Sequence, residues 1–315
     1  MTLEDLLKIK RKKLRKYLKR ISTHHDTDSY LIIPKNNTSG NVCLVSHLDT
    51  FHDTKTDKGK KLLLYDRDRK IYFNPSGLGA DDRAGVFACL YIYNSIPDEH
   101  KPIVLITDGE EAGGTGAYES IQYQELTDVS YFIELDRKGK NDMVFYNHEP
   151  KDFKNHIGKF DFTEKTGTFS DVSILGDTFD KCSVNLSIGY YNEHTRHEYL
   201  KVNELYQTIS KVKNILLEHD RQQVFTLPEY KATEHVKAGY YYSVHRTDYN
   251  MPVNDILEQW EHTRQKIDRQ KQKDNTFYDC YCYECATTVN HVDLNYGRCP
   301  YCNSLNIESY RTGGL

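Results

Sequence analysis

The hydrophobic and polar positions of this 315-residue chain alternate between short apolar runs and longer segments with a single apolar face. Apolar runs predict β-strands at 30–35, 41–46, 102–108, 129–136, 143–147 and 182–190. An apolar spacing of three to four residues predicts helices over 80–96 and 202–220, and a Gly-rich turn followed by a helix is predicted over 112–121. Strands therefore alternate with helices, which is typical of an α/β domain with a mostly parallel central sheet flanked by helices.

The first 22 residues have a different pattern. Leucines recur there at helical spacing, and residues 1–21 contain nine Lys or Arg residues but only two acids. We predict a basic amphipathic helix over 1–22. Its cations could contact nucleic acid, an anionic membrane surface or an acidic partner. We favour the interpretation in which its leucine face packs on the acidic remainder of the protein.

Composition limits the class of protein. Hydrophobic residues make up 38% of the chain and charged residues 28%, and the net charge is −4, as in a globular protein with a sizeable core. No apolar run approaches the roughly 20 residues that a membrane span needs. The amino terminus lacks the apolar segment of a secretory signal, so we expect a cytoplasmic protein.

The cysteines fall into two groups. Cys43, Cys89 and Cys182 lie in apolar stretches and fit small core residues, whereas the other five lie within 280–302. Two Cys-x-x-Cys pairs with thirteen residues between them predict a structural zinc ribbon, held by Cys282, Cys285, Cys299 and Cys302. Cys280 could replace Cys282. Because the ribbon has few basic residues, we expect it to contact a protein partner or a second copy, while nucleic acid stays open.

These patterns divide the chain into four parts. The basic helix occupies 1–22, and the α/β domain occupies 23–222. A connector with a charged helix follows at 223–275, and the zinc ribbon occupies 276–315.

Acidic and histidine side chains follow several of the predicted strands. In open α/β sheets the ligand site lies at the carboxyl ends of the strands. Each motif alone could be a surface ion pair, a helix cap or an acidic loop, but together they predict a site. The residues are His47, Asp49, Asp81, Asp82, Glu110, Glu111, Asp136 and His194. Two histidines with several carboxylates suit zinc, and also manganese or cobalt. Adjacent Glu110 and Glu111 can divide metal binding and proton transfer between them.

The motifs that contain these residues resemble those of a known superfamily. In order, they read His-x-Asp, Gly-Ala-Asp-Asp-x-Ala-Gly, Asp-Gly-Glu-Glu-x-Gly, Glu-Leu-Asp and Asn-x-His-Thr-x-x-Glu-Tyr. This set resembles the co-catalytic di-zinc exopeptidases, which include bacterial leucyl aminopeptidases, glutamyl and tetrahedral aminopeptidases, and peptidase T. The resemblance spans about residues 40–210. The gaps between the motifs are too short for the inserted domains of peptidase T or the tetrahedral enzymes, so a bare catalytic core over 23–222 is expected.

The resemblance implies roles for individual residues. Asp81 would bridge two metal ions, His47 and Asp136 would complete one site, and Glu111 and His194 the other. Glu110 would be the general base and Asp49 would orient His47. A cis peptide bond would join Asp81 and Asp82. Around the substrate, the resemblance implies a pocket-lining loop over 168–175, and the pocket candidates are Asp82, Arg137, Ser170 and Asp171. His197 is expected to be a surface or supporting residue.

The function that follows is a metal-dependent hydrolase of amide bonds, first of all a di-zinc aminopeptidase acting on short peptides. A deacylase or a carboxypeptidase acting on blocked amino acids would use the same metal site. A scaffold protein that uses only the zinc ribbon is the alternative from another class, although the intact set of ligands argues against it. The expected cofactors are two divalent ions in the active site, zinc or else manganese or cobalt, and one structural zinc.

Overall fold

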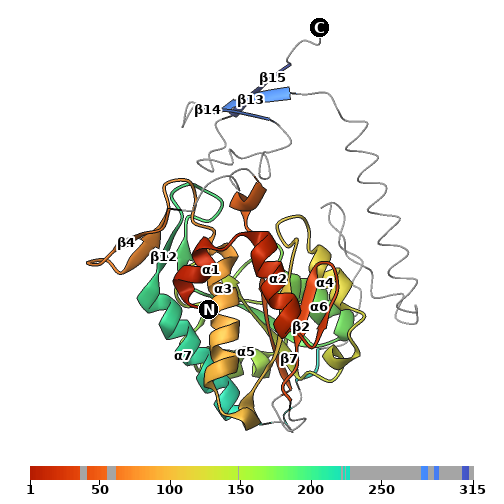
Figure 1. Cartoon of the computed structure of the whole chain (residues 1–315). Helices are drawn as coiled ribbons and strands as arrows, with labels where there is room; N and C mark the ends of the chain where they lie inside the picture. The colour runs from red at the N-terminus through yellow and green to blue at the C-terminus, as the bar shows by residue number, and fades with distance from the viewer. Residues whose placement is uncertain are drawn as a thin grey trace.

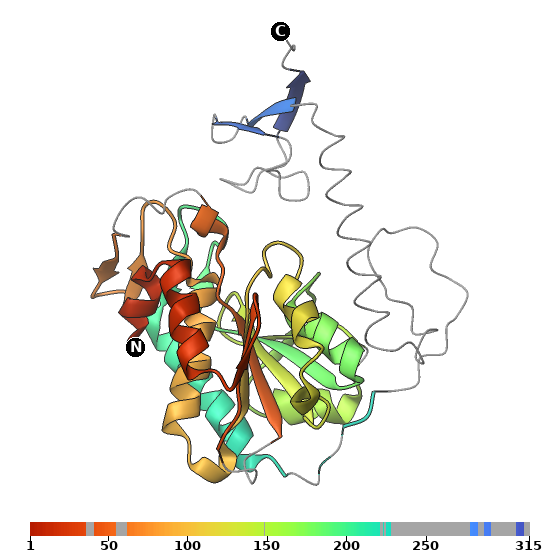
Figure 2. The same cartoon turned by 45° about the vertical axis from the view of Figure 1, so that its right-hand side comes forward.

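The computed structural model describes residues 1–35, 41–54, 62–147, 149–220, 223 and 225–227, together with three strands at 278–282, 287–290 and 307–311. Within these residues the main body is an eight-stranded sheet between two layers of helices (Figures 1 and 2). None of the described helices is long and apolar enough to cross a membrane.

The main sheet has the order β1-β2-β6-β3-β7-β10-β8-β9. Its central strands β6, β3, β7 and β10 are all parallel, while β2 and β8 flank them in antiparallel orientation. The mostly parallel sheet predicted from the apolar runs is thus confirmed. The strands are β1 (His24–His25), β2 (Ser29–Ile32), β3 (Val42–His47), β6 (Ile103–Thr107), β7 (Tyr131–Arg137), β8 (Asp142–Val144), β9 (Thr163–Lys165) and β10 (Cys182–Ser187).

Helices cover both faces because successive side chains of the central strands point in opposite directions. In β3, Leu44 joins one buried cluster, and Cys43 and Val45 join the other. The first cluster is closed by α1 (Leu3–Lys8), α2 (Arg11–Ile21), α3 (Ala80–Ser95), α5 (Lys151–Gly158) and α7 (Val202–Glu218), and the second by α4 (Thr115–Ser120) and α6 (Asp171–Phe179). Short 3-10 helices are η1 (Phe51–Thr54), η2 (Asp98–His100) and η3 (Gln124–Leu126).

A second, four-stranded sheet was not predicted. It joins β11 (Tyr190–Tyr191), β12 (Tyr199–Lys201), β5 (Ile71–Phe73) and β4 (Leu64–Asp66) in antiparallel order. Its strands have only two or three residues each, too few for a clear alternation of apolar and polar positions. The pairing of β12 with β5 brings the segment around His194 next to the segment that leads into α3.

The amino-terminal segment forms two helices, so the prediction of one continuous helix over 1–22 is wrong. Ile9 and Lys10 have extended backbones and separate α1 from α2. The fully buried Arg83 contacts the chain at this break, where its guanidinium donates to the carbonyl oxygen of Ile9 at 3.2 Å. The predicted packing of the leucine face is confirmed, because Leu14 and Leu18 are fully buried in the main core.

The prediction of a loop over 168–175 is also wrong, because most of this segment is helical. Residues from Asp171 onward form α6, and Ser170 is the residue that precedes its first turn. The apolar side chains of Val172 and Leu175, both fully buried, hold this helix on the sheet. The helix has only nine residues and begins with the polar Asp171, so its apolar residues are too few to give a clear helical spacing in the sequence.

Three strands near the carboxyl end form a separate antiparallel sheet in the order β14-β13-β15. They are β13 (Tyr278–Cys282), β14 (Thr287–Asn290) and β15 (Ile307–Arg311), so Cys280 and Cys282 lie on β13. Cys285, Cys299, Cys302 and the predicted charged helix of the connector lie outside the described residues. The zinc ribbon and the four domain boundaries therefore stay predictions.

Candidate metal centre

The predicted ligands come together at the carboxyl edge of the parallel strands. His47 is the last residue of β3, Glu110 and Glu111 follow β6, and Asp136 lies near the end of β7. Asp81 lies at the start of α3, and His194 lies between β11 and β12. Since parallel strands end at one edge of the sheet, residues up to 147 positions apart in the chain converge on it.

Two groups of side chains are each close enough to hold a metal ion. The first contains His47, Asp82 and Asp136, and the second contains Asp81, Glu111 and His194. Nε2 of His47 lies 3.3 Å from Oδ1 of Asp136, and Nε2 of His194 lies 3.0 Å from Oε2 of Glu111.

Asp81 lies between the two groups and faces both. Its Oδ1 is 3.1 Å from Nε2 of His47, and its Oδ2 is 3.2 Å from Nε2 of His194. One carboxylate thus presents one oxygen to each histidine. From this position Asp81 could bridge two metal ions, and that role stays a prediction.

Asp82 supports the backbone of the centre. It is fully buried, its Oδ1 accepts from the Gly85 N–H at 2.9 Å, and its Oδ2 accepts from the His47 N–H at 3.2 Å. The peptide bond between Asp81 and Asp82 is cis, as the resemblance implies. Asp82 therefore connects the end of β3 to the start of α3 and does not line an open pocket.

Asp49 connects His47 to the segment that carries the two glutamates. Its Oδ1 is 3.4 Å from Nδ1 of His47, and the same carboxylate accepts from the N–H groups of Gly109 at 2.7 Å and of Glu110 and Glu111 at 3.3 Å. Burial raises the pKa of Asp49, but the hydrogen bond and charge of His47 outweigh it and hold that pKa at about 2. Asp49 thus stays an anion and orients both His47 and the loop.

His194 is held in a strained backbone conformation. Its φ is +62°, which is uncommon for a residue other than glycine. Its ring stacks on Phe51 with the centroids 5.1 Å apart, and the Phe51 N–H donates to Oε1 of Glu111 at 3.0 Å. Phe51 therefore positions both His194 and Glu111.

The side chains of this centre fit divalent cations. Burial raises the pKa of Glu110 and of Glu111, and the nearby charges of Asp136 and Asp81 respectively raise them further. Burial and the charge of Asp81 likewise raise the pKa of Asp136 to about 7, although His47 opposes this. A buried group of carboxylates is costly without compensating positive charge. The mixture of imidazole nitrogen and carboxylate oxygen suits zinc, manganese or cobalt.

Several supporting residues were missed by the sequence analysis. The Tyr190 hydroxyl donates to Oδ1 of Asp136 at 3.1 Å, and Asn185 accepts from the Asp136 N–H at 3.0 Å. The buried carboxylate of Glu198 accepts from the N–H groups of Gly79 at 2.7 Å and Asp81 at 2.9 Å. Glu198 lies inside the last of the quoted motifs, so its position in that motif was the available signal.

The pocket candidates Ser170 and Asp171 are both fully buried. Ser170 donates to the buried Glu134, and Asp171 accepts from the Thr107 hydroxyl. Burial raises the pKa of Glu134, and the charges of Asp136 and Asp171 add to this. These residues form a polar layer between α6 and the sheet.

Arg137 belongs to neither ligand group, and its side chain has other partners. Its Nη2 donates to the Thr166 carbonyl at 3.4 Å, and its Nε is 3.9 Å from Oδ2 of Asp142. Those partners hold the guanidinium toward the segment between β9 and α6.

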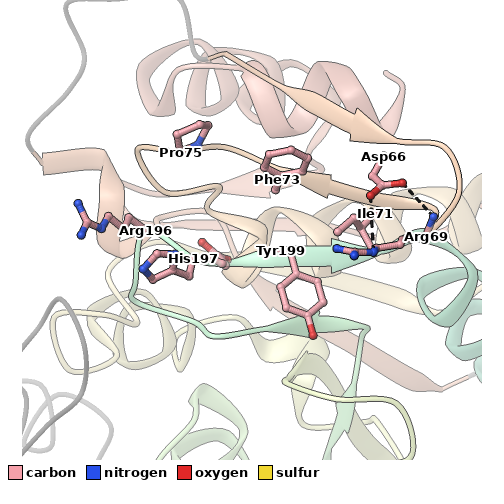
Figure 3. A pocket seen from close by; sticks show the side chains of 9 residues that line it. Asp66, Arg69, Ile71, Phe73, Pro75, Arg196, His197 and Tyr199 are labelled. Atoms are coloured by element: carbon pink, nitrogen blue, oxygen red, sulfur yellow. Dashed lines mark hydrogen bonds and ion pairs between the residues drawn. The ribbon is translucent and has the colours of Figure 1, made fainter. Parts of the chain in front are cut away.

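A cavity of about 510 Å³ lies next to the segment around Asp81. Glu198 connects the two, because it lines the cavity and accepts from the Asp81 N–H. Figure 3 shows that its wall is formed mainly by β5, β12 and the loop before β12. His197 is exposed and belongs to this wall and not to the metal centre, as expected. The lining residues are Asp66, Arg69, Ile71, Phe73, Pro75, Arg196, His197, Glu198 and Tyr199.

Comparison with solved structures supports this fold. A tripeptidase from Staphylococcus aureus subsp. aureus mu50 superposes with a TM-score of 0.52 at 16% identity, covering 68% of this chain and 96% of its own. Aminopeptidase PepT from Bacillus cereus ATCC 10987 gives 0.50 at 14% identity, with 68% and 96% covered. An aminopeptidase from the archaeon Desulfurococcus kamchatkensis gives 0.50 at 13% identity, with 70% and 94% covered. At such identities the likeness shows the fold alone.

Sequence comparison adds the family. No curated protein matches the chain. Residues 30–170, however, match the model of peptidase family M28. That range contains His47, Asp81, Glu110, Glu111 and Asp136, whereas His194 lies beyond it and is brought to the centre by the fold. Residues 30–170 are therefore similar to the domain of peptidase family M28, and the fold of the chain is similar to that of the named tripeptidase and aminopeptidase structures.

Proposed function

We propose that this protein is a metal-dependent aminopeptidase that releases amino-terminal residues from short peptides. The observation that carries the proposal is the position of Asp81, whose two carboxylate oxygens face the histidines of two ligand groups. The family M28 match and the named aminopeptidase and tripeptidase structures support the same class of enzyme.

The residues divide the chemistry between them. When bound, divalent ions in such a site polarise a carbonyl group and lower the pKa of a water molecule. Glu110 lies outside both ligand groups, and its Oε2 is 3.9 Å from Nε2 of His47. Because burial raises the pKa of Glu110, its carboxylate suits a general base that takes the proton of the attacking water and returns it to the leaving amine.

The charges around the centre favour a substrate with a positive end. Asp136 and Glu111 belong to the ligand groups and Glu110 lies beside them, whereas Arg137 is engaged by Thr166 and Asp142. Bound divalent ions would offset the charges of the ligands, so the carboxylate of Glu110, outside the ligand groups, is the negative group that attracts the α-ammonium group of a peptide and repels a terminal carboxylate. This favours an aminopeptidase over a carboxypeptidase or a deacylase that acts on blocked amino acids.

The test measures hydrolysis of aminoacyl p-nitroanilides, tripeptides and N-acetyl amino acids, with and without a chelator. We expect cleavage of the first two classes, loss of it on chelation, and recovery with zinc, manganese or cobalt. Glu110→Gln should lower kcat by about 10²–10⁴-fold while both active-site metals stay bound. A matched control is Glu164→Gln, because the exposed Glu164 carboxylate pairs with Lys154 and belongs to neither ligand group.

Each other outcome has a definite meaning. Cleavage of N-acetyl amino acids alone would favour the deacylase, and absence of metal-dependent cleavage would favour the scaffold. Loss of metal from Glu110→Gln would show that Glu110 and Glu111 have exchanged roles.

Zinc as the native metal, a cytoplasmic location and the carboxyl-terminal zinc ribbon are parts of the same proposal. The three-stranded sheet with Cys282 at the end of β13 supports the ribbon, and the buried free thiols of Cys43, Cys89 and Cys182 support a reducing location. Zinc analysis should find one ion beyond those of the active site, and a Cys282→Ser, Cys285→Ser double variant should lose that ion alone.

A further inference from the structure

The amino-terminal helix α2 reaches the loop that carries the two glutamates. Asp108 is the first residue after β6 and lies two positions before Glu110, and its side chain is fully buried. Nη2 of Arg11 lies 2.5 Å from its Oδ1, and Nε of Arg15 donates to its Oδ2. Two guanidinium groups from one helix therefore hold this carboxylate on both sides.

Arg15 also fixes the strand next to the loop. Its Nη2 lies 2.7 Å from Oδ1 of Asp28, which directly precedes β2. The Asp28 carbonyl in turn accepts from the Asp108 N–H at 2.7 Å. The loop, the strand and the helix are thus joined in one closed set of contacts.

The loop between Asp108 and Glu111 is held from the other end by Asp49, which accepts the N–H groups of Gly109, Glu110 and Glu111. The charge of Asp49 acts on Asp108 and raises its pKa, and the charge of Arg11 lowers the pKa of both carboxylates. The arginines therefore offset the repulsion between two carboxylates that must lie beside the same loop.

The other cations of α2 are different. Lys12, Lys13 and Lys16 are exposed, whereas Arg11 and Arg15 are only about one-third exposed. The helix thus contributes two specific guanidinium contacts in addition to its general positive charge.

We propose that Arg11 and Arg15 are positioning residues for the metal centre, acting through Asp108 to hold the loop that carries Glu110 and Glu111. The amino-terminal helices are then part of the working site of the enzyme. The inference rests on the proposed function for its kinetic consequences, but its effect on the metal ligand Glu111 can be measured without a substrate.

The experiment compares Arg15→Ala, Arg15→Lys and the matched control Lys16→Ala in the full chain. Zinc affinity is measured by competition with a chelator, and the absorption spectrum of the cobalt-loaded protein reports the ligand geometry. We expect Arg15→Ala to weaken metal binding or kcat by about 10–100-fold, with little change in KM. Arg15→Lys should recover only part of this, because lysine keeps the charge but lacks the planar set of donors. Lys16→Ala should match the wild type.

A double-variant cycle with Asp108→Asn tests the route of the effect. If Arg15 acts through Asp108, adding Arg15→Ala to Asp108→Asn should produce almost no further loss. Additive losses would overturn the inference, as would a lower Tm for Arg15→Ala and Arg15→Lys with unchanged zinc affinity, cobalt spectrum and kcat. A protein without peptidase activity whose metal site still responds to Arg15→Ala would contradict the proposed function and leave this inference standing.

Discussion

At the scale of single residues, the metal centre depends on side chains outside both ligand groups. Glu198 shows this, because its two oxygens accept from the N–H groups of Gly79 and Asp81. Gly79 has a φ of +70°, in the left-handed region that favours glycine, so the chain turns sharply there before Asp81. Glu198 therefore fixes the backbone from which the central carboxylate of Asp81 projects.

We predict that Glu198→Gln weakens zinc binding by about 10–100-fold, as is typical when a partner of a metal ligand is changed. Glutamine keeps one carbonyl oxygen, but its amide group cannot accept from the second N–H. Chelator competition measures the effect, and kcat at saturating zinc shows whether geometry is also lost. Glu125→Gln, which changes only a surface pair with His24, serves as the control. Equal zinc affinity in Glu198→Gln and the wild type would contradict the prediction.

Residue types at strand ends were enough to predict the candidate ligands, but not the residues that hold them. The ligand types are chemically distinctive and follow apolar runs, as His47 does. Glu198 reaches Asp81 across 117 positions, and Arg15 reaches Asp108 across 93. Such pairings depend on how the sheet brings distant segments together, which no local pattern encodes.

At the scale of elements, the strands that could be predicted from the sequence are the longer and more deeply buried ones. Strands β3 and β6 are buried along almost their whole length, so their apolar runs were plain in the sequence. Strands β4 and β5 have three residues each, none of them buried, and were missed. The break between α1 and α2 was also missed, and the Arg83 side chain that donates to the Ile9 carbonyl at the break lies 74 positions away in the chain.

The leucine face of α2 provides a stability prediction at this scale. Leu18 is fully buried in the main core, whereas Lys16 on the same helix is exposed. Leu18→Ala should lower the free energy of unfolding by about 2–5 kcal/mol, because it removes buried methyl groups and leaves a cavity. Lys16→Ala should change it by less than about 0.5 kcal/mol. Urea unfolding measures both values, and similar effects would show that α2 is not packed as described.

At the scale of the whole molecule, the edge of the sheet opposite the metal centre is closed by aromatic packing. Tyr131 at the start of β7 contacts Phe153 and His156 of α5, His219 just after α7, and Phe225. The cluster joins the strand, both helices and the segment that follows them. It lies at the amino end of β7, whereas Asp136 lies near the carboxyl end, so the aromatic cluster and the metal centre are at opposite ends of one strand.

His156 makes this cluster sensitive to acid. Burial, with the positive charges of Lys159 and His219, lowers the pKa of His156 to about 4, and an unfolded histidine titrates near 6.5. The unfolded chain therefore binds more protons between these values, and stability falls as the pH drops from about 6.5 to about 4. We expect His156→Gln to lose about 1–2 kcal/mol less than the wild type between pH 7 and pH 4.5, measured by urea unfolding of the zinc-free protein. Exposed His25→Gln should behave like the wild type, and parallel pH profiles for all three proteins would refute the role of His156.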